Sequence, residues 1–363
     1  MNGYIKALGI AATSAGKRAL RLHLNENRGG CSPAVLQALQ RLTTEDIASY
    51  PDYTAAIDAA AAYFGVPADW VMLVNGLDDA VRLLSEAAAN RGALTPAGPG
   101  SFSGVILDPA FDMYAAGILG AGGRVSRVAP RENFVFSLDD VLAASEEARL
   151  IYLTDPNNPT GIGLPTGAVE ALSAARPEAT IFLDEAYADF SGRSFIPTLR
   201  SAPERFPNVI VGRTFSKAFG LAGLRVGVLI APPATLAPIE ALPSPFNVNA
   251  AAAVALPAAL SDPAWMRSTV AEAAESRQAV YDYCDRVGLE YWRSEANFVL
   301  VRVAEDTAST TAIVEAFAAR DILVRDRSSA PGCRGCIRIT TGLLAHTARC
   351  LRALEEIRAS RND

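Results

Sequence analysis

Histidine is almost absent from this chain of 363 residues, which contains only His23 and His346. The two lie far apart in the sequence and no Gly-x-Ser-x-Gly motif accompanies them, which argues against a Ser-His-Asp hydrolase. The scarcity of histidine also argues against a zinc centre, so we expect no metal site. If the chain is an enzyme, residues other than histidine must move the protons.

Long apolar runs are also missing, and none approaches the roughly 18 residues of a membrane helix. Half of the residues are hydrophobic and 20% are charged, which is typical of a globular protein. The mildly apolar residues 7–15 contain Thr13 and Ser14 and no clear cleavage pattern, so we expect a flexible arm and not a signal peptide. The net charge of −6 and the scattered basic residues predict neither a nucleic-acid partner nor a membrane partner.

Cysteine is infrequent and odd in number, with five residues spread along the chain. Cys333 and Cys336 form a single Cys-x-x-Cys pair, with no second pair to complete a zinc site. We therefore expect free thiols and a location in the reducing cytoplasm.

The chain is longer than one hydrophobic core usually supports, so two domains are expected. Between residues 50 and 230, short apolar strands alternate with helical stretches, which predicts an α/β fold with a mostly parallel central sheet flanked by helices. We expect ligands at the carboxyl ends of its strands. The predicted elements are strands at 71–74, 104–107, 150–154, 180–183, 209–211 and 226–230, and helices at 78–89 and from 113 to 119.

A proline-rich segment at residues 231–246 ends this pattern, because its five prolines are expected to interrupt regular structure. Beyond it lies a smaller α/β domain, with a helical region at 248–287 that breaks near Pro257, strands at 297–303 and 336–340, and a helix at 309–319. The expected division is an N-terminal arm with part of the small domain at 1–40, a large domain at 41–240 and a small C-terminal domain at 241–363. A long loop is expected at 91–104.

The most specific motif is TFSKAFGLAGLR at residues 214–225, which follows a predicted strand. Lys217 lies between a hydroxyl residue and glycines, where an amine of lowered pKa could react with an aldehyde cofactor. Arg225 could return to the same site and pair with a phosphate. A surface lysine beside a glycine turn is the alternative.

A second motif, FLDEAYADF at residues 182–190, places Asp184 directly at a strand end. A carboxylate there could pair with a protonated pyridine nitrogen, and Tyr187 could hydrogen-bond a phenolic oxygen on the same ring. An ordinary helix-capping aspartate is the alternative.

Two further loops also follow strands. In DPNNPTG at residues 155–161, Asn158 could donate an amide hydrogen bond to a phenolate oxygen, although a simple turn explains the same letters. In VNGLDDA at residues 74–80, the backbone N–H groups of Leu77 and Asp78 open a helix and could hold a phosphate. Together, a lysine, a carboxylate, an amide, a helix start and an arginine are what pyridoxal phosphate requires.

With these motifs in place, the sequence resembles the class I/II aminotransferases of pyridoxal-phosphate fold type I, and most closely the histidinol-phosphate aminotransferases. The resemblance extends over most of the chain, from residue 24 to residue 342. The motifs that carry it are LNEN at 24–27, YPD at 50–52, PAFDMY at 109–114, NNPTG at 157–161, DEAYADF at 184–190, RTFSKAFGLAGLR at 213–225, and RD at 325–326 before IRITTG at 337–342.

The resemblance implies a role for each matching residue. Lys217 would bind the cofactor aldehyde covalently and move the Cα proton, with Asp184 and Tyr187 completing the catalytic set. The cofactor-binding residues would be Tyr50 (from the other subunit of a homodimer), Leu77, Asp78, Phe111, Asn158, Asp184, Tyr187, Thr214, Ser216, Lys217 and Arg225. The substrate-binding residues would be Asn25, Arg325 and Arg338, with Arg338 clamping a carboxylate.

The implied reaction is transfer of an amino group from an anionic donor to a 2-oxo acid by a ping-pong mechanism. Histidinol phosphate and aromatic α-amino acids are both candidate donors. Two departures from the family pattern bear on that choice: Arg28 replaces a proline, and Phe111 replaces the commoner tyrosine. The same scaffold also carries decarboxylases of threonine phosphate, and a non-catalytic cofactor-binding protein is a third alternative.

Overall fold

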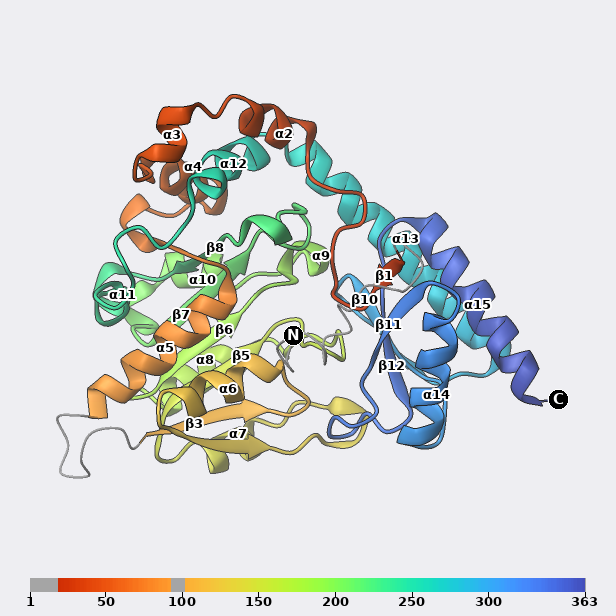
Figure 1. Ribbon diagram of the computed structural model, residues 1–363. Coiled ribbons are helices and arrows are strands. Elements are labelled where there is room, and N and C mark those ends of the chain that lie inside the picture. The colour runs from red at the N-terminus through yellow and green to blue at the C-terminus, as the bar shows by residue number, and fades with distance from the viewer. Residues whose placement is uncertain (1–18, 93–101, 363) are drawn as a thin grey trace.

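The computed structural model describes residues 19–92 and 102–362, and these form two lobes, each built on its own sheet (Figure 1). The predicted N-terminal arm at residues 7–15 lies outside the described residues, as does most of the loop predicted at 91–104. The α/β architecture with a mostly parallel central sheet is confirmed.

The larger lobe contains a seven-stranded sheet in the order β2-β8-β7-β6-β5-β3-β4. Its strands are β2 (Val71–Val74), β3 (Ser103–Leu107), β4 (Arg124–Val128), β5 (Ala148–Thr154), β6 (Thr180–Asp184), β7 (Val209–Thr214) and β8 (Gly227–Ile230). β8 runs antiparallel to both of its neighbours, β2 and β7, and the other neighbouring strands are parallel. All six predicted strands are present. The missed strand, β4, is an edge strand whose two arginines interrupt the apolar pattern.

Helices cover both faces of this sheet. Successive side chains of each strand point to opposite faces, so they enter two separate cores. One core joins the strands to α2 (Pro33–Gln40), α4 (Thr54–Phe64), α8 (Ala168–Ala175), α10 (Ile196–Ser201) and α12 (Ala250–Leu260). The other joins them to α5 (Leu77–Gly92), α6 (Asp112–Gly120) and α11 (Pro233–Glu240). The short elements between them are α3 (Thr44–Ala48), η1 (Ala68–Trp70), η2 (Glu132–Phe134), α7 (Leu138–Ala144), α9 (Ala188–Ser191), η3 (Pro203–Arg205) and η4 (Ala222–Leu224).

The smaller lobe contains a five-stranded sheet in the order β1-β11-β12-β10-β9. Its strands are β1 (Leu20–Leu22), β9 (Tyr291–Trp292), β10 (Phe298–Arg302), β11 (Ile322–Asp326) and β12 (Cys336–Thr340), covered by α13 (Pro263–Val287), α14 (Thr307–Ala318) and α15 (Leu344–Asn362). The sequence predicted β10, β12 and α14. The pairing of β1 with β11 brings an N-terminal segment into this C-terminal lobe.

Two details of the proline-rich region differ from the prediction. Residues 231–246 do not lack regular structure, because α11 begins at Pro233, where a missing N–H costs nothing, and it also contains Pro238. The helical region does not break at Pro257, which lies inside α12; it breaks at Ser261 and Asp262, and Asp262 caps α13 by accepting a hydrogen bond from the backbone of Trp265. The domain boundary at residue 240 stays a prediction, and α12, which lies beyond it, packs in a core of the large lobe.

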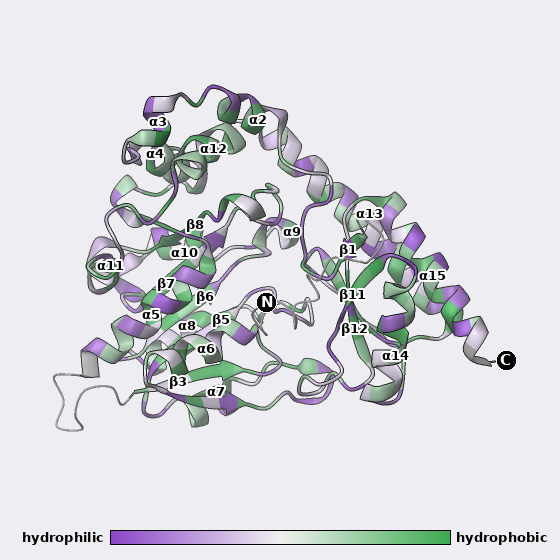
Figure 2. Ribbon diagram, in the orientation of Figure 1, coloured by the Kyte–Doolittle hydropathy of each residue, from purple (hydrophilic) through white to green (hydrophobic). Residues whose placement is uncertain are grey.

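Figure 2 shows hydrophobic residues concentrated on the strands of both sheets, whereas the long helices alternate between hydrophobic and hydrophilic residues along their length. Within residues 19–92 and 102–362, none of the helices combines the length and apolar character that a membrane crossing needs.

Candidate active site

A cavity of about 510 Å³ lies where the carboxyl ends of the large sheet's parallel strands face the small lobe. The structure brings every predicted site residue except Tyr50 to its wall. The predicted residues that line it are Asn25, Leu77, Asp78, Phe111, Asn158, Asp184, Tyr187, Thr214, Ser216, Lys217, Arg225, Arg325 and Arg338. Residues from β5, β6 and β7 and from the loops after them therefore meet residues of β11 and β12, although they are far apart in the sequence.

Lys217 enters this cavity from the loop that follows β7, and its Nζ donates a 3.1 Å hydrogen bond to the carbonyl of Leu24. Burial, and next the positive charge of Arg338, lower the pKa of Lys217 to about 8. At pH 7 roughly a tenth of this amine is therefore uncharged, and the uncharged amine is the form that attacks a carbonyl carbon.

Asp184, the last residue of β6, is buried in the wall of the cavity. Its Oδ1 accepts a hydrogen bond from the backbone N–H of Ala186 at 2.8 Å, and its Oδ2 accepts one from the hydroxyl of Tyr114 at 2.6 Å. Burial raises the pKa of Asp184 to about 6, and these hydrogen bonds oppose the rise. A cationic partner in the cavity would stabilise this carboxylate, since a buried charge without an ionic partner is costly.

A chain of hydrogen bonds connects the two lobes across the cavity. The amide of Asn25 donates to the hydroxyl of Tyr187 at 2.9 Å and is itself fixed by Thr340 of β12. Arg338 donates to the side-chain oxygen of Asn158 and, at 2.7 Å, to the carbonyl of His23. Burial lowers the pKa of Arg338 to about 9, and the positive charges of Arg327 and Arg325 add to the effect.

The start of α5 forms another wall, with Leu77 and Asp78 as its first residues. Gly76, just before the helix, has a φ of 78°, and a Cβ there would collide with Nη2 of Arg225. Arg225 in turn lies 3.0 Å from Oδ2 of Asp78. Helix N–H groups and a guanidinium thus converge on one place, which is a suitable site for a phosphate group.

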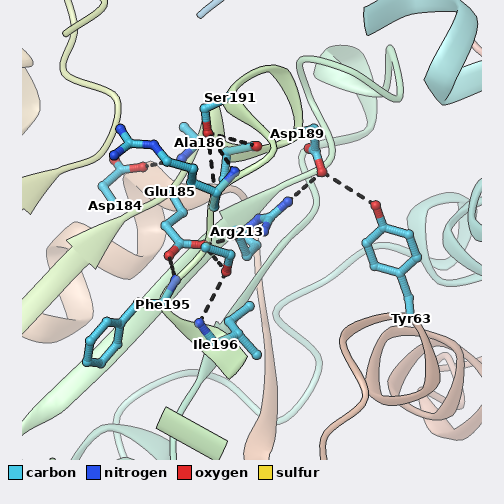
Figure 3. Close-up of polar contacts among 12 residues, drawn as sticks. Tyr63, Asp184, Glu185, Ala186, Asp189, Ser191, Phe195, Ile196 and Arg213 are labelled. Carbon is cyan, nitrogen blue, oxygen red and sulfur yellow. Dashed lines mark hydrogen bonds and ion pairs between the residues drawn. The ribbon is translucent and has the colours of Figure 1, made fainter. Parts of the chain in front are cut away.

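A buried cluster of charged residues lies beside the carboxyl ends of β6 and β7 (Figure 3). Arg213 of β7 contacts Glu185 at 3.3 Å and Asp189 at 2.5 Å, and Tyr63 donates to the same Asp189 oxygen at 3.4 Å. Glu185 also accepts hydrogen bonds from Ser194 and from the backbone of Phe195, both at 2.6 Å. The cluster ties the segment after Asp184 to the strand that leads to Lys217.

Phe111 and Arg28, the two departures from the family pattern, occupy different places. Phe111 lines the cavity and packs edge-on against Tyr114, with ring centroids 5.6 Å apart. Arg28 does not line this cavity; its Nε is buried and has no hydrogen-bond partner among the described residues.

Tyr50 does not reach the cavity within this chain. Its side chain is 78% exposed and stacks on Phe246, with ring centroids 4.1 Å apart. The expected contribution to a cofactor site in a second subunit therefore stays a prediction.

Sequence reasoning gave no role to several residues of the site, of which Tyr114, Glu26 and Arg327 also line the cavity. Tyr114 and Glu26 lie inside motifs that carried the resemblance, PAFDMY and LNEN, but only the packed structure shows which groups they face. Arg327 lies one residue beyond the RD pair at 325–326.

The residues present fit pyridoxal 5'-phosphate. The cavity supplies an amine of lowered pKa, a buried carboxylate for a pyridine nitrogen and a helix start with an arginine for a phosphate. This set on a mostly parallel sheet defines a pyridoxal-phosphate enzyme of fold type I.

The comparisons with known proteins identify the family. The pattern described as "Aminotransferase class I and II" matches residues 17–357, so the chain belongs to this family of pyridoxal-phosphate-dependent aminotransferases. It is 38% identical over 343 residues to histidinol-phosphate aminotransferase 2 of Ralstonia nicotianae, covering 93% of this chain and 88% of that one. It is 36% identical to histidinol-phosphate aminotransferase of Bacillus licheniformis, covering 80% and 78%. The crystal structure of histidinol-phosphate aminotransferase from Sinorhizobium meliloti in complex with pyridoxal-5'-phosphate superimposes with a TM-score of 0.83 at 29% identity, covering 95% and 92%.

Proposed function

We propose that this aminotransferase takes the amino group of histidinol phosphate, with a 2-oxo acid as the acceptor in the second half of a ping-pong cycle. The relatives that carry this activity in their names, at 31–38% identity, support the choice. Aromatic α-amino acids remain the alternative class of amino donor.

The observation that carries the proposal is the pairing of Arg325 with Arg338 across β11 and β12, in the same cavity as Lys217. Two guanidinium groups on adjacent strands form a rigid, strongly cationic wall. Such a wall favours a donor that carries an anionic group, since guanidinium forks bind phosphate and carboxylate bidentately.

The cofactor, when bound, supplies an aldehyde and an electron-withdrawing ring that acidifies the Cα–H of an attached amine. Lys217 is the residue with a suitable pKa to take the proton from Cα and to return it. Asp184 would pair with the ring nitrogen and keep it protonated, while Tyr187 and Asn158 would hold the phenolic oxygen. Arg338 and Arg325 hold the donor's anion and so orient its Cα–H toward Lys217.

The test is a half-reaction between the holoenzyme and single donors without acceptor. Histidinol phosphate is compared with histidinol, phenylalanine and threonine phosphate, and the keto product, the aminated cofactor and carbon dioxide are measured. We expect rapid stoichiometric amination of the cofactor with histidinol phosphate alone. Faster reaction with phenylalanine would contradict the proposed donor, and carbon dioxide release from threonine phosphate would indicate a decarboxylase.

We also propose that the enzyme is a homodimer in which Tyr50 contacts the cofactor phosphate of the other subunit. Large hydrophobic side chains on α2, α3, α12 and the adjoining segments support this: Leu36, Ile47, Tyr50, Phe246 and Val254 are all exposed in the single chain. Sedimentation at micromolar concentration should give twice the chain mass. A Tyr50→Phe variant should remain dimeric but bind the cofactor more weakly, and a monomer with full activity would contradict both statements.

The free state of all five cysteines supports a location in the reducing cytoplasm. Fractionation of the source cells tests this: recovery with a cytoplasmic marker is expected, and recovery outside the cytoplasm would contradict it.

A further inference from the structure

Glu26 lines the same cavity as Lys217 and has one carboxylate oxygen without a partner. It lies in the segment that leads from β1 to α2, which runs between the two lobes (Figure 1). Its Oε1 accepts a 2.6 Å hydrogen bond from Nη2 of Arg21, whereas its Oε2 is buried and has no hydrogen-bond partner among the described residues. A buried carboxylate oxygen without a donor is costly, so a ligand that supplies an N–H group would stabilise it.

The backbone on both sides of Glu26 is held in place. Before it, Asn25 has a left-handed φ of 55°, and its backbone N–H donates to Oγ1 of Thr340 at 3.0 Å. After it, Nδ2 of Asn27 donates to the carbonyl of Ala218 at 3.2 Å, in the loop that carries Lys217. The carboxylate of Glu26 is therefore presented to the cavity from a fixed backbone, which is what a recognition residue requires.

The other acidic residues of the cavity wall are already engaged. Asp184 accepts a hydrogen bond on each of its oxygens. Asp78 and Asp112 each lie 4.0 Å or less from an arginine. The free oxygen of Glu26 is therefore the carboxylate oxygen of this wall that is best placed to accept a hydrogen bond from a substrate.

Glu26 differs in kind from the basic groups around it. Those groups are Lys217, Arg225, Arg325, Arg327 and Arg338. A guanidinium only donates hydrogen bonds, whereas an ionised carboxylate only accepts them. An anionic part of a substrate can bind to the arginines, but an N–H group on the same substrate needs an acceptor such as Glu26.

We propose that Glu26 is a specificity-determining residue whose carboxylate accepts a hydrogen bond from a ring N–H group on the side chain of the amino donor. Its free oxygen turns toward the ring as the donor enters, by rotation within the side chain, while Arg21 holds the other oxygen. An imidazole ring supplies the N–H group and a phenyl ring does not. The inference rests on the proposed function, because it explains how the same cavity would choose histidinol phosphate over phenylalanine.

The test uses the holoenzyme with histidinol phosphate and phenylalaninol phosphate, two donors that share the amine and the phosphate and differ in the ring. Glu26→Gln keeps the shape of the side chain and an acceptor for Arg21, but it presents an NH2 group in place of the free oxygen. Glu26→Ala removes both oxygens. Glu290→Gln is the control for loss of one carboxylate, because Glu290 pairs with Arg302 at 2.5 Å and does not line this cavity.

In both Glu26 variants we expect the KM of histidinol phosphate, divided by that of phenylalaninol phosphate, to rise roughly tenfold, since one charged hydrogen bond is lost. Glu290→Gln should leave this ratio unchanged. The negative charge of Glu26 also raises the pKa of Lys217, but a change in that pKa affects both donors alike and cancels in the ratio. Equal changes in KM for the two donors would overturn the proposal.

Calorimetric titration with imidazolylpropyl phosphate and phenylpropyl phosphate, which lack the amine, gives a readout that does not need turnover. We expect the unaltered holoenzyme and Glu290→Gln to bind the imidazolyl compound more tightly, and both Glu26 variants to lose this preference. If histidinol phosphate does not react but the preference depends on Glu26, the proposed function fails and the role of Glu26 stands. If histidinol phosphate reacts and the Glu26 variants keep the preference, the role of Glu26 fails and the proposed function stands.

Discussion

Tyr114 of α6 donates a 2.6 Å hydrogen bond to Asp184 at the end of β6, and the hydroxyl of Thr154 lies 3.0 Å from the same tyrosine oxygen. The bond matters because Asp184 is buried, and Tyr114 is the strongest of the groups that hold its pKa down. A tyrosine on a neighbouring helix therefore helps to decide whether the carboxylate is charged when the cofactor arrives.

Replacing Tyr114 by phenylalanine should make Asp184 harder to ionise. Cofactor affinity of the apoenzyme should fall as the pH drops through about 6, where Asp184 takes up a proton. In Tyr114→Phe this fall should begin at a higher pH, which fluorescence titration of the apoenzyme with cofactor would detect. Tyr152→Phe is the control, since that ring stacks on Tyr114 but its hydroxyl bonds to Ser85 and Val81. Superimposable pH profiles for all three proteins would contradict the prediction.

Asp184→Asn should make the apoenzyme more stable and the holoenzyme nearly inactive. Folding raises the pKa of Asp184 from 3.8 to about 6, so only the folded state holds the proton between these values and stability falls as the pH rises through them. The asparagine variant has no charge to bury. Its amide oxygen can still accept from the backbone of Ala186, and its NH2 group can donate to the Tyr114 hydroxyl, which then acts as the acceptor. We expect a gain of about 1–3 kcal/mol in free energy of unfolding at pH 8 that disappears near pH 4.

Urea unfolding of the two apoenzymes at both pH values would measure this difference. Turnover of the asparagine variant should fall by about a hundredfold or more, because the ring nitrogen loses its charged partner. A variant that is less stable at pH 8, or one that keeps its turnover, would show that Asp184 is not a functional carboxylate held at a cost to the fold.

Gly76→Ala should weaken cofactor binding without unfolding the chain. The glycine has a left-handed backbone, and the new methyl group would displace Arg225 from the start of α5. We expect the cofactor dissociation constant to rise roughly tenfold, since one charged contact to the phosphate is disturbed. Gly120→Ala, whose methyl group meets nothing within 4 Å, is the control. Equal affinity in both variants would place the phosphate elsewhere.

The buried cysteines should resist thiol reagents. Burial raises the pKa of Cys333 to about 11 and those of Cys284, Cys336 and Cys350 to about 12, so almost no thiolate exists at pH 8. Only Cys31, which is half-buried, should react readily in the native protein, and all five should react in denaturant. Rapid reaction of Cys333 or Cys336 in the native state would contradict this burial.

The strands of the large sheet and the cavity residues could be predicted from the sequence because most of these strands are apolar runs that end in a polar motif. Sequence reasoning missed β4, whose arginines interrupt the run, β1 and β9, which have three residues or fewer, and β11, whose apolar run of three residues ends at Arg325. It also expected irregular structure where α11 forms. That expectation was wrong because proline is tolerated in the first turn of a helix. Propensity alone could not settle these cases.

The contacts that set the pKa values in the site could not be predicted from the sequence, for a different reason. The hydrogen bond from Tyr114 to Asp184 joins residues 70 positions apart, and the one from Lys217 to the Leu24 carbonyl joins residues 193 positions apart. Motifs indicate which groups are available for chemistry. Burial and neighbouring charges, which set the pKa values of Lys217 and Asp184, follow only from the packed structure.

The covalent attachment of the cofactor to Lys217 is the most direct test of the account. Lysine occurs at only three positions of the chain, 6, 17 and 217, so the site of attachment can be assigned without ambiguity. Borohydride reduction of the holoenzyme, followed by peptide mass mapping, should place one cofactor per chain on Lys217 and none on Lys217→Ala. Cofactor found on Lys6 or Lys17, or unchanged labelling of the Lys217→Ala variant, would contradict the central claim.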